Sequence, residues 1–206
     1  MLHKDSLIIQ EAQEATKALL NHGVVAFPTE TVMGLGVIFD DELAYKKLNQ
    51  VKRRPEDKPY TMMLSNVEDI NEYAVIDEAT QRVIDKFMPG SITILVPVKK
   101  DKVPSYVTHG TGIIGMRIPQ NVEAKRLLEV VGKPLLVPSA NRSGEKPAMR
   151  AEEAREIFGS EIDFVMSGKA IGGVPSTIVD LVNKEPKVVR QGPISEEEIK
   201  KVYFGS

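Results

Sequence analysis

The sequence predicts an α/β fold: one twisted, mixed β-sheet with helices packed against it. Segments with apolar residues at helical spacing alternate with short runs rich in valine, isoleucine and threonine along all 206 residues. This alternation lacks the regular strand–helix–strand order of a purely parallel sheet, so both strand directions are expected. Because no internal repeat and no Gly/Ser-rich linker divides the chain, we expect a single domain over residues 1–206.

The N-terminal half is predicted to begin with a helix over residues 8–22, where Ile8, Ala12, Ala15 and Leu19 share one face. The elements expected next are strands at 24–27 and 32–39, a helix at 41–52, a strand at 60–64, a short helix after 65, a helix at 77–88 and a strand at 91–98. Two glycines interrupt the strand at 32–39, which predicts a bulge or a close approach by another group.

The C-terminal half continues the same alternation. Ile114, Met116 and Ile118 have the two-residue period of a strand. Ser195 with Glu198 three residues later forms a capping box, which predicts a last helix. The elements expected between these two are a helix at 121–131, a strand at 134–138, a helix at 151–158 and short strands near 162–166, 177–182 and 187–190.

Composition excludes several classes of protein and site. The chain has no cysteine, so it forms neither disulfides nor thiolate metal sites, and its three histidines are isolated, so no metal site is expected. A net charge of −2 argues against a uniformly basic nucleic-acid coat. No signal peptide and no run of about 18 apolar residues is present, which predicts a soluble, cytoplasmic protein without membrane contact.

Neither of two common nucleotide-binding motifs fits this sequence. Residues 110–115 match G-x-G-x-x-G, but they lead into an alternating segment that meets Pro119, whereas a dinucleotide site needs a helix there. We therefore expect a glycine-rich turn entering a strand. No P-loop motif occurs, so any bound ATP would be held in another way.

Five segments place polar residues where a buried core would not favour them: 27–36, 52–59, Arg117, 137–144 and 175–192. Each alone has an ordinary explanation, such as a turn, a helix cap or a surface ion pair. Together they supply several cations with hydroxyl and amide groups but no histidine or cysteine. This set suits the binding of phosphate oxygens better than acyl transfer, because guanidinium groups present a planar fork to phosphate or carboxylate.

At these segments the chain resembles the YrdC/Sua5/YciO family, which includes threonylcarbamoyl-AMP synthases. The shared motifs, in the family's order, are PTETVxGLG at 28–36, K-x-R-P at 52–55, G-x-R-x-P at 115–119, SAN-x-SG at 139–144, PSTIVD at 175–180 and R-x-G at 190–192. The resemblance implies a single YrdC-like domain with a large, positively charged groove on a mixed sheet.

The resemblance further implies a nucleotidyltransferase that makes threonylcarbamoyl-adenylate and pyrophosphate from L-threonine, bicarbonate or CO2, and ATP, for N6-threonylcarbamoyladenosine modification of tRNA. Mg2+ would arrive with the phosphates of ATP rather than in a protein cage. Further implied partners are tRNA or double-stranded RNA and the threonylcarbamoyl-transfer proteins that act downstream.

The resemblance also implies roles for individual residues. Lys52 and Arg54 would be catalytic, holding the triphosphate as pyrophosphate leaves. The residues implied to bind ATP are Lys52, Arg54, Lys58, Ile113, Ser139, Asn141 and Arg190. Those implied to bind threonine are Thr31, Arg117, Val137 and Ser176.

Some positions depart from the family pattern. Met63 stands where Sua5-type members often have a histidine near threonine, and Met33 replaces an aromatic residue. The chain ends too early for the extra C-terminal domain of long Sua5 proteins, which points to the short YrdC or YciO branch. Two alternatives therefore stay open: a YciO-like RNA-binding protein, and a hydrolase of a related carbamoyl or nucleotide compound.

Overall fold

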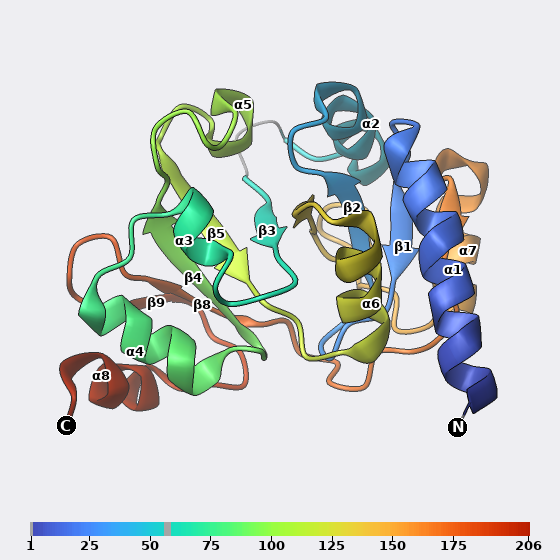
Figure 1. Ribbon diagram of the computed structural model, residues 1–206. Coiled ribbons are helices and arrows are strands. Elements are labelled where there is room, and N and C mark those ends of the chain that lie inside the picture. Colours follow the sequence, from blue (N-terminus) through green and yellow to red (C-terminus); the bar gives the residue numbers. More distant parts are fainter. Residues whose placement is uncertain (1, 56–58) are drawn as a thin grey trace.

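The computed structural model describes residues 2–55 and 59–206 (Figure 1). The helices are α1 (Leu2–Leu20), α2 (Glu42–Lys52), α3 (Ile70–Tyr73), α4 (Glu78–Phe87), α5 (Ser105–Thr108), α6 (Val122–Val131), α7 (Ala151–Phe158) and α8 (Glu196–Phe204), with a 3-10 turn at Gly159–Glu161. The strands are β1 (Val25–Phe27), β2 (Gly34–Ile38), β3 (Thr61–Met63), β4 (Ile92–Pro97), β5 (Ile113–Arg117), β6 (Leu135–Leu136), β7 (Phe164–Val165), β8 (Thr177–Asp180) and β9 (Lys187–Arg190).

Each predicted helix and strand is present, with ends that differ by a few residues. Local capping explains several ends, since the side chain of Asp41 caps α2 and the predicted capping box of Ser195 and Glu198 begins α8. The glycine-rich turn is also confirmed, because Gly110 and Gly112 have positive φ and lead into β5. Among the described elements, α5 and the 3-10 turn at Gly159–Glu161 were not predicted, because a single turn carries no periodicity.

The nine strands form one mixed sheet in the order β7-β1-β2-β6-β3-β5-β4-β8-β9, which confirms the predicted fold class. The pairs β1–β7, β3–β5 and β4–β8 are parallel, and the other neighbours are antiparallel. Figure 1 shows α1 beside α6 at the β1–β2 end, and α4 beside α8 at the opposite end. In the described part of the chain, no helix combines the length and the apolar character needed to cross a membrane.

The core lies on both faces of the sheet, as the two-residue period of a strand requires. On β1 and the residue before it, Val24 and Ala26 face one buried cluster, while Val25 and Phe27 face the other, beneath α1 and α6. The ring of Phe27 lies directly over β2, where a Cβ on Gly36 would be only 2.8 Å from the ring. This contact is the close approach that the glycines of β2 predicted.

Candidate functional site

The central strands leave part of one sheet face open, and that face forms the floor of a cavity of about 140 Å³. Strand register brings the floor residues together: Met63 pairs with Arg117, Thr93 with Ile178, and Ile178 with Arg190. The opposite face of the same strands is buried against helices, as Met62 and Met116 show. The floor therefore comes from alternate residues of strands that lie far apart in the sequence.

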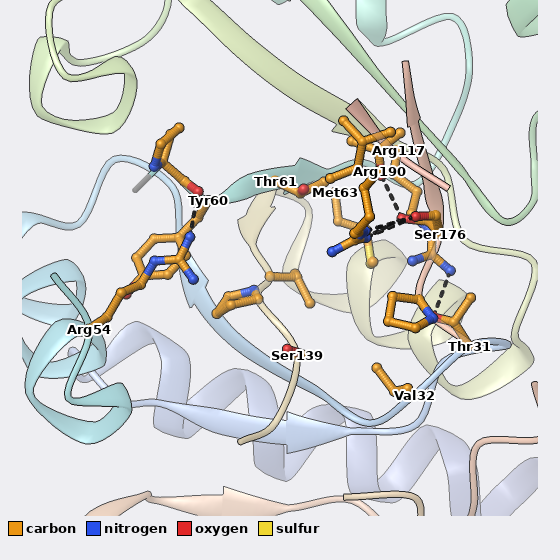
Figure 2. A pocket seen from close by; sticks show the side chains of 16 residues that line it. Thr31, Val32, Arg54, Tyr60, Thr61, Met63, Arg117, Ser139, Ser176 and Arg190 are labelled. Atoms are coloured by element: carbon orange, nitrogen blue, oxygen red, sulfur yellow. Dashed lines mark hydrogen bonds between the residues drawn. The ribbon is translucent and has the colours of Figure 1, made fainter. Parts of the chain in front are cut away.

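The walls of the cavity are loops that follow or precede these strands. The residues that line it, besides the floor residues, are Thr31, Val32, Arg54, Pro59, Tyr60, Thr61, Val137, Pro138, Ser139, Pro175 and Ser176. Figure 2 shows Arg117 and Arg190 reaching toward Thr31 and Ser176 on one side, with Arg54 and Tyr60 on the other. Among the described lining residues three are arginines and none is acidic, so the cavity favours an anionic ligand.

Arg117 lies at the floor, where it joins two residues of the segment after β1. Its Nη2 donates to Oγ1 of Thr31 at 3.2 Å and forms an ion pair with Glu30. Thr31 is fixed in turn, since its Oγ1 lies 2.9 Å from that of Thr29. The guanidinium and the hydroxyl expected at the threonine site are therefore adjacent, although the main partner of Arg117 in this structure is a carboxylate of the chain itself.

Arg190 and Ser176 form a second pair on the same side. Arg190 donates to the carbonyl oxygen of Ser176 through Nε at 3.1 Å and Nη2 at 2.9 Å, and Nη2 also donates to Oγ of Ser176 at 3.1 Å. The Ser176 hydroxyl also lies 2.9 Å from Oγ1 of Thr93. Burial, and then the nearby charge of Arg117, lower the pKa of Arg190. An anion between the two guanidinium groups would relieve their repulsion.

Close packing around Gly192, the glycine of the R-x-G motif, leaves no room for a side chain. A Cβ at this position would lie 2.3 Å from the Thr177 nitrogen and 2.5 Å from the Pro175 carbonyl oxygen. The chain after Arg190 therefore packs directly against the backbone around Ser176. This contact keeps Arg190 and Ser176 in register.

Arg54 lies over the ring of Tyr60, with its guanidinium carbon 4.7 Å from the ring centroid, and donates to the carbonyl oxygen of Pro59 at 3.0 Å. Tyr60 is anchored by Asn49, which accepts from its hydroxyl at 2.5 Å. Stacking on an aromatic ring restricts the orientation of a guanidinium group. Arg54 is therefore held at the rim of the cavity, opposite Arg190.

Lys52 occupies a different position from the one its implied role suggests. Its side chain is fully buried, and Nζ donates to the Ser139 carbonyl at 2.6 Å, the Asn141 carbonyl at 2.8 Å and Oδ1 of Asn141 at 3.2 Å. Burial, and then the charge of Arg54, lower the pKa of Lys52 to about 7. The ammonium group thus supports the 139–141 loop from beneath and does not line the cavity.

Some of the other candidate residues line the cavity, and others do not. Ser139 and Val137 line the cavity, whereas the Asn141 amide donates to the carbonyls of Arg142 at 2.9 Å and Glu145 at 2.8 Å and so stabilises the loop. Ile113 lies at the start of β5, four residues from Arg117, and is not among the lining residues. Lys58 lies outside the described residues.

Sequence reasoning missed several residues of the site. Thr61 and Thr93 looked like ordinary strand residues, and Tyr60 like the start of a strand, yet all three line the cavity. Glu30 was noted only as part of a polar segment. For Tyr60, an aromatic residue six positions after Arg54 was a usable signal, since arginine often stacks on such rings. Met63, noted as a departure, does lie in the cavity.

Known proteins share the sequence pattern and the fold of this chain. Residues 17–192 match the family model Sua5_yciO_yrdC, described as "Telomere recombination". The threonylcarbamoyl-AMP synthase of Pyrococcus abyssi is 36% identical over 87% of this chain, and that of Idiomarina loihiensis is 32% identical over 84%. The chain spans 53% of the length of the Pyrococcus protein and 94% of the Idiomarina protein.

Two solved structures share the fold. The structure of P. abyssi Sua5 complexed with L-threonine superposes with a TM-score of 0.89 and 33% identity, covering 94% of this chain and 57% of that protein. The structure of Escherichia coli YciO superposes with a TM-score of 0.86 and 26% identity, covering 93% of each chain. Since the family model matches most of the chain and these structures share its architecture, this protein belongs to the Sua5/YciO/YrdC family.

Proposed function

We propose that this protein is a threonylcarbamoyl-AMP synthase, which forms threonylcarbamoyl-adenylate and pyrophosphate from L-threonine, bicarbonate or CO2, and ATP. The observation that carries the proposal is the shared cavity: Arg54, Arg117, Ser139, Ser176 and Arg190 come from separate segments and converge on it. A set of guanidinium and hydroxyl groups without histidine or cysteine suits positioning and charge stabilisation in phosphoryl chemistry.

The threonine end of the cavity is assigned to Thr31, Arg117, Val137 and Ser176. Arg117 would pair with the carboxylate of threonine, and the hydroxyls of Thr31 and Ser176 would bind the amino acid or its carbamate. All four residues line the cavity. P. abyssi Sua5, which shares this fold, has been solved in complex with L-threonine, and that complex supports an amino-acid pocket here.

The binding of ATP is assigned to Arg54, Ser139 and Arg190, with Lys52 and Asn141 supporting Ser139 from beneath. The carbamate oxygen would attack the α-phosphorus of ATP, and the bond to the leaving pyrophosphate would break. Arg54 would stabilise the charge that develops on pyrophosphate. Since the described lining residues include no carboxylate, Mg2+ would be carried by the phosphates. Lys58 and Ile113 keep their assignment to ATP only through the family resemblance.

The direct test is a pyrophosphate-release assay in which threonine, bicarbonate and ATP are omitted one at a time. We expect release only with all three present, and less with serine in place of threonine. Release without threonine would refute the proposal and favour a hydrolase. Absence of release, together with RNA binding that weakens steeply with salt, would favour the RNA-binding alternative.

Arg54→Ala tests the assigned role of one cavity residue. Because a charged hydrogen bond contributes about 1.5–3 kcal/mol, we expect adenylate formation to slow at least about tenfold with the fold intact. Arg126→Ala is the matched control, since Arg126 lies on the surface of α6 and pairs only with Glu129 among the described residues. An unchanged rate in well-folded Arg54→Ala protein would contradict the role.

A further inference from the structure

The Glu30 carboxylate joins the floor of the cavity to the start of α6. Its Oε1 forms the ion pair with Nη2 of Arg117. Its Oε2 accepts from the backbone nitrogens of Gln120 and Asn121, both at 3.1 Å. One carboxylate thus links the guanidinium group of Arg117 to the backbone just before α6.

The two backbone contacts do not serve mainly to cap the helix. Asn121 caps α6 with its own side chain, which accepts from the Ala124 nitrogen at 2.9 Å. The nitrogens that Glu30 binds come before the first helical residue, and their positions follow from the chain between β5 and α6. The start of α6 therefore anchors the carboxylate, whose two acceptor contacts there are backbone N–H groups.

Arg117 depends on this anchor for its orientation. Its side chain is only 7% exposed, and that of Glu30 is 16% exposed, so the charge of the pair is poorly screened by solvent. Nε of Arg117 is buried and has no hydrogen-bond partner among the described residues. The hydrogen bonds described for the guanidinium go from Nη2 to Glu30 and Thr31.

The backbone of the same segment also reaches the loop before Ser176. The Glu30 carbonyl accepts from the Gly172 nitrogen at 3.1 Å, and the Thr31 carbonyl accepts from the Gly173 nitrogen at 2.8 Å. A Cβ on Gly172 would lie 2.6 Å from the Glu30 carbonyl oxygen, so this contact is close. Glu30 therefore contacts both Arg117 and the loop before Ser176, and it is the residue next to Thr31.

We propose that Glu30 is a positioning residue, which holds Arg117 in the orientation that binds the carboxylate of the amino-acid substrate. The identity of that substrate rests on the proposed function, whereas the orientation of Arg117 does not. Glu30 acts through Arg117 and touches no reacting atom. Its removal should weaken threonine binding and leave ATP binding nearly unchanged.

The test compares Glu30→Gln with Glu123→Gln. Glutamine keeps the shape of glutamate, but it is uncharged and has one acceptor oxygen instead of two. It therefore cannot accept from Arg117 with one oxygen and from the two backbone nitrogens with the other. Glu123 lies in the first turn of α6, lines a surface hollow together with Glu30, and forms no ion pair with a described residue, so it controls for lost charge in that region. We expect Glu30→Gln to raise the KM for threonine at least about tenfold and that for ATP less than about twofold. Glu123→Gln should change neither.

A double-mutant cycle separates positioning from a general structural role. In the Arg117→Met background, Glu30→Gln should leave the KM for threonine within about twofold, because the residue that it positions is gone. Equal effects of Glu30→Gln in both backgrounds would overturn the proposal. Tighter threonine binding by Glu30→Gln would also overturn it, since Glu30 would then be a competitor for Arg117.

A readout without substrate keeps this inference apart from the proposed function. In protein labelled with 15N-arginine, the Nε–H signal of Arg117, assigned by its loss in Arg117→Met, should report a rigid side chain in the wild type. Glu30→Gln should make that signal mobile on the fast timescale, whereas Glu123→Gln should not. A rigid Arg117 in folded Glu30→Gln protein would refute the inference, even if the wild type released no pyrophosphate.

Discussion

In Lys52→Met protein the free energy of unfolding should rise less with pH above pH 7 than in the wild type, because Lys52 is buried and has a lowered pKa. In the native state its pKa is about 7, owing first to burial and then to the charge of Arg54, against 10.5 for an ordinary lysine. Between these values the native state holds Lys52 as a neutral amine while the unfolded chain binds a proton. The stability linked to the neutral amine is therefore fully present above pH 10.5 and is lost as pH falls to about 7.

The size of the effect follows from linkage. One proton of difference between the two states changes the unfolding free energy by about 1.4 kcal/mol per pH unit. Wild type should therefore gain about 3 kcal/mol relative to Lys52→Met between pH 7 and pH 9.5. Above pH 7 the neutral amine has two N–H groups for the three oxygen atoms that accept from Nζ, so it cannot donate to all three at once.

The measurement is urea unfolding of wild type and Lys52→Met at half-unit steps from pH 6 to pH 9.5. Lys46→Met is the control, because Lys46 lies exposed on the same helix and its pair with Glu42 is screened by solvent. Its stability should follow that of the wild type across the whole range. Parallel curves for wild type and Lys52→Met above pH 7 would refute the assignment of a lowered pKa to this lysine.

Two further predictions concern the Arg190 side of the cavity. Gly192→Ala should displace the backbone around Ser176, because the added Cβ would lie 2.3 Å from the Thr177 nitrogen; we expect thermal unfolding at a lower temperature and a raised KM for threonine, and an unchanged melting curve would contradict the close contact. Arg190→Lys keeps a positive charge but cannot reproduce the paired donation of Nε and Nη2 to the Ser176 carbonyl. The KM for ATP in pyrophosphate-release kinetics should rise about tenfold, and wild-type kinetics in this variant would show that the fork geometry is dispensable.

The sequence was sufficient to predict the fold class, because each element depends on local signals that it carries. Apolar spacing located the helices, and the alternation in 114–118 located β5. Capping residues such as Asp41 and Ser195 fixed helix starts, since a cap needs only the residues next to it. Strand order and register were not predictable in this way, because they are set by packing between distant segments.

The site shows the same division between local and long-range causes. The motifs identified Arg54, Arg117 and Arg190 as candidates, and all three line the cavity. Lys52 carried an equally strong motif, but its position depends on three oxygen atoms of a loop almost ninety residues away. Glu30 stood next to Thr31 in the sequence, yet its role depends on Arg117, which no spacing rule connects to it. Lining residues were thus easier to predict than the contacts that hold them.

The charges around the two neighbouring guanidinium groups support the proposed roles of Arg117 and Arg190. Arg117 is paired with Glu30, so its surroundings are close to neutral and suit a zwitterion such as threonine. Arg190 donates to neutral groups of Ser176, and in the described part of the chain it forms no ion pair, so its positive charge remains available to a phosphate. If the roles of Arg117 and Arg190 were exchanged, a phosphate at Arg117 would meet the Glu30 carboxylate, and the repulsion between like charges would oppose binding.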